Sequence, residues 1–197
     1  VPFTQNYRWH LPLLLLVFCC SFFINNGAIF ADIMESRNII TAREMVYDHN
    51  WLVPTMNGEL RLEKPPLPTW IAAITEMISP DNLPLQRAMA GFAAVMLVLF
   101  FYKFATKLTD NRTYALVSSL VLCTSYNIIL MGRTATWDIY CHAFMMGAIY
   151  YLYLALRQNP CKWTYFIGAG IFMGLSFLGK GPVSFYALLL PFVCAYI

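Results

Sequence analysis

The residues of this chain that could do chemistry are charged side chains placed beside long apolar runs. The acidic members of this set are Asp32, Glu35 and Asp138. A carboxylate within hydrogen-bond reach of a hydroxyl group can take its proton. The basic members are Arg37, Lys64, Arg133 and Lys180. Cations of this kind stabilise the charge that develops on a departing phosphate. The two groups together therefore suit a site that activates a hydroxyl group and binds a phosphate.

Each of these positions also has a purely structural interpretation. Asp138 precedes an apolar run and can cap a helix N-terminus, and Lys180 can cap the carbonyls at a helix end. Lys64 can be an interfacial lysine that extends its charge towards water. Arg133 can form an ion pair with Asp138, and Glu63 can pair with Lys64. The sequence leaves both interpretations open for these residues.

Metal ligands are not indicated by the spacing of histidines and cysteines. His142 lies four residues after Asp138 on the same helical face, but without a third ligand a core histidine is favoured. The cysteines lack CxxC spacing and are interpreted as small apolar packing residues; they are Cys19, Cys20, Cys123, Cys141, Cys161 and Cys194. The sequence requires no cofactor, and it leaves a divalent cation open.

The composition places these residues in a membrane. Hydrophobic residues make up 59% of the chain and charged residues 12%, which is too little polar surface to cover a soluble globule. The net charge is +3 and the basic residues are scattered, so the sequence predicts no nucleic-acid partner.

Six apolar segments approach the length of about 20 residues that a helix needs to cross a bilayer. The segments are 11–30, 88–106, 113–131, 139–156, 163–178 and 182–197. The first is too long and too polar at Asn25-Asn26 for a simple signal peptide, so we interpret it as a retained span. The sequence therefore predicts an all-α, polytopic helical bundle.

The short basic connections predict the orientation of the bundle. Lysine and arginine are enriched on the cytoplasmic side of membrane proteins. The basic residues of these connections are Arg8, Lys103, Lys107, Arg112, Arg157 and Lys162. This distribution puts the long segment 31–87, Arg133 to Asp138 and Lys180 together on the non-cytoplasmic side of a cytoplasmic (inner) membrane.

Two amphipathic stretches are predicted to be interfacial helices within the outer segment. The first contains Ile39 to Asp48, with Thr41 and Glu44 spaced as a capping box, and the second is Thr69 to Ile78. Prolines between them break any helix and leave Glu63-Lys64 on an irregular connection. Loops of this kind often carry function.

Three motifs, in this order, carry a resemblance to a known family. They are Met34-Glu35-Ser36-Arg37 with the later Glu63-Lys64-Pro65-Pro66, then Arg133-Thr134-Ala135-Thr136-Trp137-Asp138, then Gly179-Lys180-Gly181-Pro182. The chain resembles the GT-C glycosyltransferases, and most of all the aminoarabinose (lipid A) transferase branch of the protein O-mannosyltransferase superfamily. The likeness extends from about residue 11 to the end.

The resemblance implies a GT-C-like fold and transfer of a sugar from a polyprenyl-phosphate carrier. The acceptor would be lipid A, a protein or another glycan on the non-cytoplasmic side, among membrane lipids. It also implies catalytic roles for Glu35, Asp138 and Asp32. Lipid-phosphate binding falls to Lys64, Arg37, Arg133, Lys180 and Glu63. Met34 stands where the family commonly has its first catalytic aspartate, so Glu35 or Asp32 is expected to replace it.

Two other functions compete with a glycosyltransferase. A membrane transporter also carries charges near helix ends, but it should show charges near mid-span or paired broken helices. A noncatalytic relative that binds the lipid carrier would explain the methionine at position 34.

Overall fold

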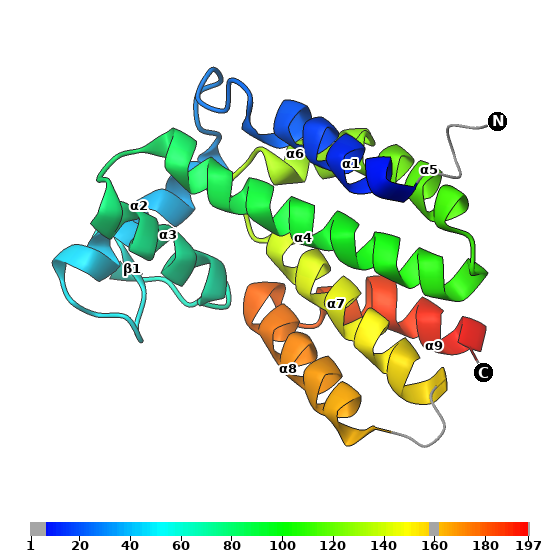
Figure 1. Cartoon of the computed structure of the whole chain (residues 1–197). Coiled ribbons are helices and arrows are strands. Elements are labelled where there is room, and N and C mark those ends of the chain that lie inside the picture. The colour runs from blue at the N-terminus through cyan, green and yellow to red at the C-terminus, as the bar shows by residue number, and fades with distance from the viewer. Residues whose placement is uncertain (1–6, 158–161, 197) are drawn as a thin grey trace.

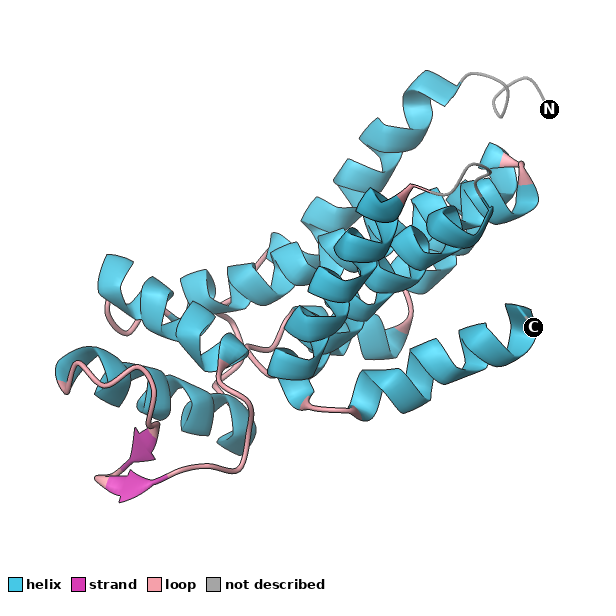
Figure 2. Cartoon of the chain, turned by 90° about the horizontal axis from the view of Figure 1, so that it is seen from below, coloured by secondary structure: helices cyan, strands magenta, loops and turns pink. Residues whose placement is uncertain are grey.

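A computed structural model describes residues 7–157 and 162–196 of the chain. The helices are η2 (Tyr7–Trp9), α1 (His10–Phe18), η3 (Cys19–Phe23), α2 (Ile33–Tyr47), α3 (Leu67–Ile78), α4 (Leu83–Thr109), α5 (Arg112–Cys123), α6 (Tyr126–Gly132), α7 (Asp138–Arg157), α8 (Trp163–Lys180), η4 (Phe185–Leu189) and α9 (Leu190–Tyr196). The strands β1 (Thr55–Met56) and β2 (Glu59–Leu60) form a short antiparallel hairpin, seen in Figure 2. The predicted all-α class is confirmed.

Helix α4 is the centre of the bundle. It packs against α5 and α7, and α7 packs against α8. The α2–α3 pair and the hairpin lie at one end of this bundle, away from both chain termini (Figure 1). A separate small core of Ala42, Met45, Ala72 and Ala73 joins α2 to α3. The bundle therefore carries a compact cap at one end.

Among the described residues, α4 and α7 are long and apolar enough to cross a membrane. The predicted span 113–131 is not one straight helix, because α5 and α6 meet at an angle of 65°. At this break the hydroxyls of Thr124 and Ser125 donate to the carbonyls of Leu120 and Leu122, at 2.8 Å each. Such side-chain bonds compete with the helical ladder. The pair counts as a third span only if it crosses as one broken element.

The predicted first span, 11–30, is helical only to Phe23. Ile24 is extended and Asn25 has a left-handed φ of 55°, which an α-helix cannot include. The chain then turns back towards the start of α4, where Gly27 lies against the ring of Pro84. This turn and Arg87 of α4 line the same pocket.

Helix α2 begins earlier than the sequence pattern predicted. Asp32 is its N-cap and accepts a hydrogen bond of 2.7 Å from the backbone N–H of Glu35. The predicted capping box at Thr41 and Glu44 is therefore wrong. Thr41 lies in mid-helix, where its hydroxyl donates to the carbonyl of Arg37 at 2.8 Å. The second predicted amphipathic helix, 69–78, is contained in α3.

Candidate functional site

A buried ion pair joins the cap to the bundle. The Glu35 side chain is fully buried, and Arg87 at the start of α4 donates from Nε to Oε1 at 2.8 Å and from Nη2 to Oε2 at 2.7 Å. Glu35 Oε1 also accepts the backbone N–H of Ala135 at 2.8 Å. Arg87 Nη1 donates to the carbonyls of Asn26 and Ile29, at 2.9 and 2.8 Å. One ion pair thus fixes α2, α4 and two connecting turns.

Asn38, one helical turn after Glu35, completes the attachment of the Arg133–Asp138 segment. Its Nδ2 donates to the carbonyl of Ala135 at 3.1 Å, and its Oδ1 accepts from Thr69 Oγ1 at 2.8 Å. Side chains of α2 therefore bind both the backbone N–H and the carbonyl of Ala135. The sequence analysis named neither Arg87 nor Asn38 as a site residue. Asn38 lies three residues after Glu35, so the two side chains share one helical face. This spacing could have indicated Asn38 as a site residue.

Asp138 forms an ion pair with Lys180, which connects the start of α7 to the end of α8. The two side chains are 29% and 25% exposed, so the pair remains open to the outside. Gly179 brings the helices close here, because a Cβ at this position would lie 3.2 Å from the backbone nitrogen of Cys141. Two predicted site residues, 42 positions apart, are thereby brought together.

One interpretation of the sequence paired Arg133 with Asp138, but in the structure Arg133 binds other groups. Its Nη1 donates to the carbonyl of Ser21 at 3.0 Å, and its Nη2 donates to those of Ile24 and Asn25 at 2.8 and 3.2 Å. Arg133 therefore satisfies carbonyls at the C-terminal end of the first apolar segment. A cation is favourable at such an end because of the helix dipole.

A pocket of about 270 Å³, called here the cationic pocket, contains the ion pair of Asp138 and Lys180. Lys64 also lines it, although it comes from the irregular connection before α3. The pocket is lined by Asp32, Met34, Lys64, Leu130, Met131, Thr134, Thr136, Trp137, Asp138 and Lys180. Two cations from separate segments thus face one cavity, beside two carboxylates.

A second pocket of about 330 Å³, called here the asparagine pocket, contains Arg133. Its lining is Asn25, Asn26, Ile29, Phe30, Asp32, Glu35, Arg87, Tyr126, Ile129, Leu130, Arg133 and Thr134. Asn26 is 8% exposed, and neither atom of its amide has a hydrogen-bond partner among the described residues. Buried polar groups are normally satisfied, so this amide marks a place for a polar ligand group or water.

Asp32 lies between the two pockets, because it lines both together with Leu130 and Thr134. Only one oxygen of its carboxylate, Oδ1, accepts the capping bond from Glu35, and no described residue donates to Oδ2. Asp32 is exposed, whereas Glu35 is buried with both oxygens paired. Of the two carboxylates expected to replace the family aspartate, Asp32 is the accessible one.

The remaining predicted residues lie outside this arrangement. Arg37 and Glu63 are exposed and line neither pocket, and no ion pair joins Glu63 to Lys64 in the described ranges. His142 Nδ1 lies 2.6 Å from the carbonyl oxygen of Asp138. The part of the chain that the structure describes holds no group of three metal-ligating side chains. Of the cysteines, Cys123 and Cys141 are buried, Cys19, Cys20 and Cys194 are exposed, and Cys161 lies outside the described residues.

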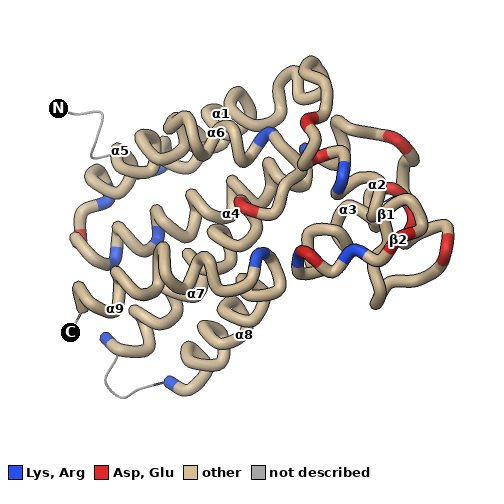
Figure 3. The backbone as a smooth tube through the Cα atoms, turned by 180° about the vertical axis from the view of Figure 1, so that it is seen from behind, with Lys and Arg blue, Asp and Glu red and all other residues tan. Residues whose placement is uncertain are grey.

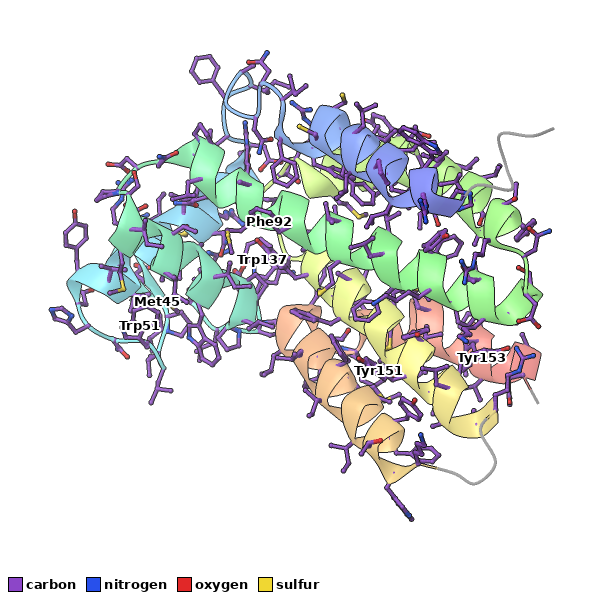
Figure 4. All side chains as sticks on the ribbon, viewed as in Figure 1. Met45, Trp51, Phe92, Trp137, Tyr151 and Tyr153 are labelled. Carbon is purple, nitrogen blue, oxygen red and sulfur yellow. The ribbon has the colours of Figure 1, made fainter. Side chains whose placement is uncertain are left out.

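The acidic residues gather at the end of the molecule that carries this site. Figure 3 shows most of them around α2, α3 and the hairpin. Asp138 lies at the start of α7, and Asp110 is the C-cap of α4. Trp137 lies where the α2–α3 cap meets the start of α7 (Figure 4). Both pockets are therefore at the junction of cap and bundle, and most basic connections are at the other end.

Several known proteins have sequences that align with most of this chain. Undecaprenyl phosphate-alpha-4-amino-4-deoxy-L-arabinose arabinosyl transferases from Shewanella sediminis and Yersinia enterocolitica are 32% and 28% identical over 165 and 163 residues. Each alignment covers 81% of this chain and 29% or 28% of the relative. The chain thus spans about a third of the length of the curated relatives that it matches.

The fold is that of the solved ArnT structures. The crystal structure of ArnT from Cupriavidus metallidurans bound to undecaprenyl phosphate superposes with a TM-score of 0.75 at 16% identity, over 97% of this chain and 36% of that one. The predicted GT-C-like fold is confirmed, and with its apolar helices the chain is a membrane protein.

Most of the chain also matches a model of a protein family. Residues 63–196 match the model described as dolichyl-phosphate-mannose-protein mannosyltransferase. The match includes Lys64, the Arg133–Asp138 segment and Lys180, so that two of the three motifs lie wholly inside it. Since it extends over most of the sequence, the chain belongs to the dolichyl-phosphate-mannose-protein mannosyltransferase family.

Proposed function

We propose that the protein transfers a sugar from a polyprenyl-phosphate carrier to an acceptor hydroxyl at the junction of cap and bundle. The observation that carries the proposal is the pair of pockets that share Asp32, Leu130 and Thr134. A transferase must hold two substrates so that their reacting atoms meet. Two cavities with one common wall, and a carboxylate in that wall, satisfy this requirement.

The donor phosphate occupies the cationic pocket in this proposal. Lys64 and Lys180 can both donate charge-assisted hydrogen bonds to phosphate oxygens. Asp138 holds Lys180 in place before the donor binds. The binding of undecaprenyl phosphate by the solved ArnT, which shares the fold, supports this class of donor.

The acceptor occupies the asparagine pocket. Its rim carries Ile29, Phe30 and Tyr126, which are 75%, 97% and 76% exposed and suit the apolar chains of a lipid. Deeper inside, the amide of Asn26 can donate to one hydroxyl group and accept from another. This combination supports an amphiphilic, hydroxyl-bearing acceptor.

Asp32 is the general base of the proposed reaction. The acceptor oxygen attacks the anomeric carbon, and the bond from that carbon to the phosphate oxygen breaks. The acceptor proton passes to Oδ2 of Asp32, and the carrier leaves as polyprenyl phosphate held by the lysines. Asp138 is less suited to this role, because its Oδ1 is already bound to Lys180.

The reaction takes place on the non-cytoplasmic side of the inner membrane, with several helices spanning the bilayer. The separation of the basic connections from the site supports this orientation. Arg157 at the end of α7 pairs with Asp110 and lies close to the end of α4, so these connections also cluster in space.

The proposal is tested with the full-length protein in detergent or lipid nanodiscs, supplied with undecaprenyl-phosphate-linked sugar and a lipid acceptor. Transfer of labelled sugar, reduced in Lys64→Ala, is the expected result. If the protein binds the carrier but transfers no sugar, it is a noncatalytic relative. If it moves the carrier across the membrane of vesicles and transfers no sugar, it is a transporter.

A further inference from the structure

A small cavity beside Lys64 is lined by a buried arginine, Arg61, that forms no ion pair with any described carboxylate. Arg61 is 8% exposed, and its Nη1 donates to the carbonyl of Arg37 at 2.6 Å and to Thr41 Oγ1 at 2.7 Å. Its Nη2 has no hydrogen-bond partner among the described residues. A buried charge without a partner is costly, so its retention requires an explanation.

Trp137 supplies a second unsatisfied donor at the same place. It is 2% exposed, its Nε1 has no partner in the described part of the chain, and its ring lies 5.4 Å from the guanidinium carbon of Arg61. Arg61, Trp137 and Lys64 all line one cavity of about 10 Å³. Lys64 and Trp137 also line the cationic pocket, so the small cavity adjoins that pocket.

The acceptors around this cavity are already engaged. The carbonyl of Pro54 accepts from the N–H of Arg61, and the carbonyl of Pro66 accepts from that of Trp70, both at 2.9 Å. The hydroxyl of Thr41 donates to the carbonyl of Arg37, and the hydroxyl of Thr69 donates to Asn38 Oδ1. Among the described residues that line the cavity, the side-chain groups left without a partner are donors: Arg61 Nη2, Trp137 Nε1 and the Lys64 ammonium. Three converging donors suit an anion.

The cavity is large enough for only one oxygen atom of such an anion. A volume near 10 Å³ holds about one water-sized atom. A whole phosphate does not fit, but one oxygen of a phosphate held at Lys64 does. Burial lowers the pKa of Arg61 from its usual value, and the neighbouring Arg37 lowers it further against the opposing effect of Glu63. An anionic oxygen in contact would compensate for this burial.

We propose that Arg61 and the indole N–H of Trp137 form an oxyanion subsite that binds one oxygen of the carrier phosphate behind Lys64. This inference rests on the proposed function, because it assumes a phosphate in the cationic pocket. It adds two residues, Arg61 and Trp137, that the sequence analysis did not name as phosphate-binding residues. Trp137 immediately precedes Asp138, so the subsite also ties the phosphate to the segment that carries the ion pair.

The test measures binding alone, with full-length protein in detergent micelles and no sugar or acceptor present. The dissociation constants of undecaprenyl phosphate and of undecaprenol are measured by thermophoresis for wild type, Trp137→Phe, Arg61→Gln and Arg61→Lys. Trp163→Phe, on an exposed tryptophan of α8, and Arg43→Gln, on an arginine paired with Asp81, are the matched controls.

We expect Trp137→Phe to weaken undecaprenyl phosphate binding by about tenfold and Arg61→Gln by about 100-fold, from the loss of hydrogen bonds to a charged group. Arg61→Lys should retain part of the affinity, and the controls and undecaprenol binding should not change. Excess inorganic phosphate should displace undecaprenyl phosphate from the wild type. If Arg61→Gln does not fold, Trp137→Phe alone decides the outcome.

Three results would overturn the subsite. Wild-type affinity in Trp137→Phe and in any folded Arg61 variant would mean that the cavity holds water only. An equal loss for undecaprenol and undecaprenyl phosphate would assign the residues a structural role. Inorganic phosphate that binds without displacing the lipid would make this a site for free anions. Because no transfer is measured, failure of the glycosyltransferase proposal leaves these results interpretable.

Discussion

At the residue scale, the three carboxylates of the site differ in the groups that they bind. Glu35 is buried with both oxygens bound to Arg87, Asp138 is paired with Lys180, and Asp32 has one oxygen available. The sequence predicted these three acids as a group, but it could not rank them. Their partners Arg87 and Lys180 lie 52 and 42 residues away along the chain, and only the fold brings them together.

Glu35→Gln tests whether this residue is structural. Removing one member of a buried ion pair costs about 3–5 kcal/mol, so the unfolding temperature of the full-length protein should fall by several degrees. Donor affinity and turnover should fall together with the folded fraction. Glu59→Gln, at an exposed position in β2, is the control and should be neutral. A stable Glu35→Gln protein that binds donor normally but is inactive would instead make Glu35 a catalytic residue.

Lys64→Ala tests the donor phosphate site. If Lys64 binds phosphate in both the ground state and the transition state, its loss should weaken donor binding and lower turnover together. We expect a reduction in donor affinity of about tenfold or more, from the loss of a charge-assisted hydrogen bond. Equilibrium binding and initial rates measure the two effects. Unchanged donor binding in Lys64→Ala would remove the lysine from the phosphate site.

At the scale of elements, helix packing places Lys180 beside Asp138. The sequence predicted the helix that became α8 almost to its ends, because apolar composition and length define it well. Gly170 and Gly174 have the GxxxG spacing that is typical of close helix packing, yet a Cβ at either position would have no neighbouring atom within 4 Å. The close approach occurs at Gly179 against Cys141. Which glycine faces a neighbouring helix depends on tertiary contacts that a spacing rule does not contain.

Gly179→Ala tests this packing, with Gly174→Ala as a matched control on the same helix. The new methyl group at 179 would lie 3.1–3.2 Å from atoms of Cys141, including its backbone, so α8 has to shift. We expect a lower unfolding temperature and reduced turnover, because Lys180 moves with the helix. Gly174→Ala should be neutral or stabilising by up to about 1 kcal/mol, from helix propensity. Equal effects of the two substitutions on thermal unfolding would contradict the account.

At the scale of the whole molecule, the charged residues distinguish the two ends of the bundle. The cap, both pockets and most acids lie at one end, and most basic connections lie at the other. Composition and the lengths of the apolar segments were enough to predict a helical membrane bundle. They were not enough to predict the break between α5 and α6 or the turn after Phe23, because both depend on a few polar side chains within apolar runs.

Cysteine labelling tests the orientation. In a cysteine-free background, single cysteines at Glu59 and Asp81 in the cap, and at Lys107 in the α4–α5 connection, are treated with a membrane-impermeant thiol reagent. In intact spheroplasts, the cap positions should react and position 107 should react only after permeabilisation. The reverse pattern would place the site in the cytoplasm and exclude the proposed topology.

The accessible carboxylate between the two pockets is the centre of the account, and Asp32→Asn tests it most directly. Asparagine caps helices about as well as aspartate, so α2 should keep its start and the protein its unfolding temperature. The substitution removes the base, so the single-turnover rate of sugar transfer should fall by about 100-fold or more, while the donor dissociation constant stays near that of the wild type. A folded Asp32→Asn protein that transfers sugar at the wild-type single-turnover rate would contradict the central claim.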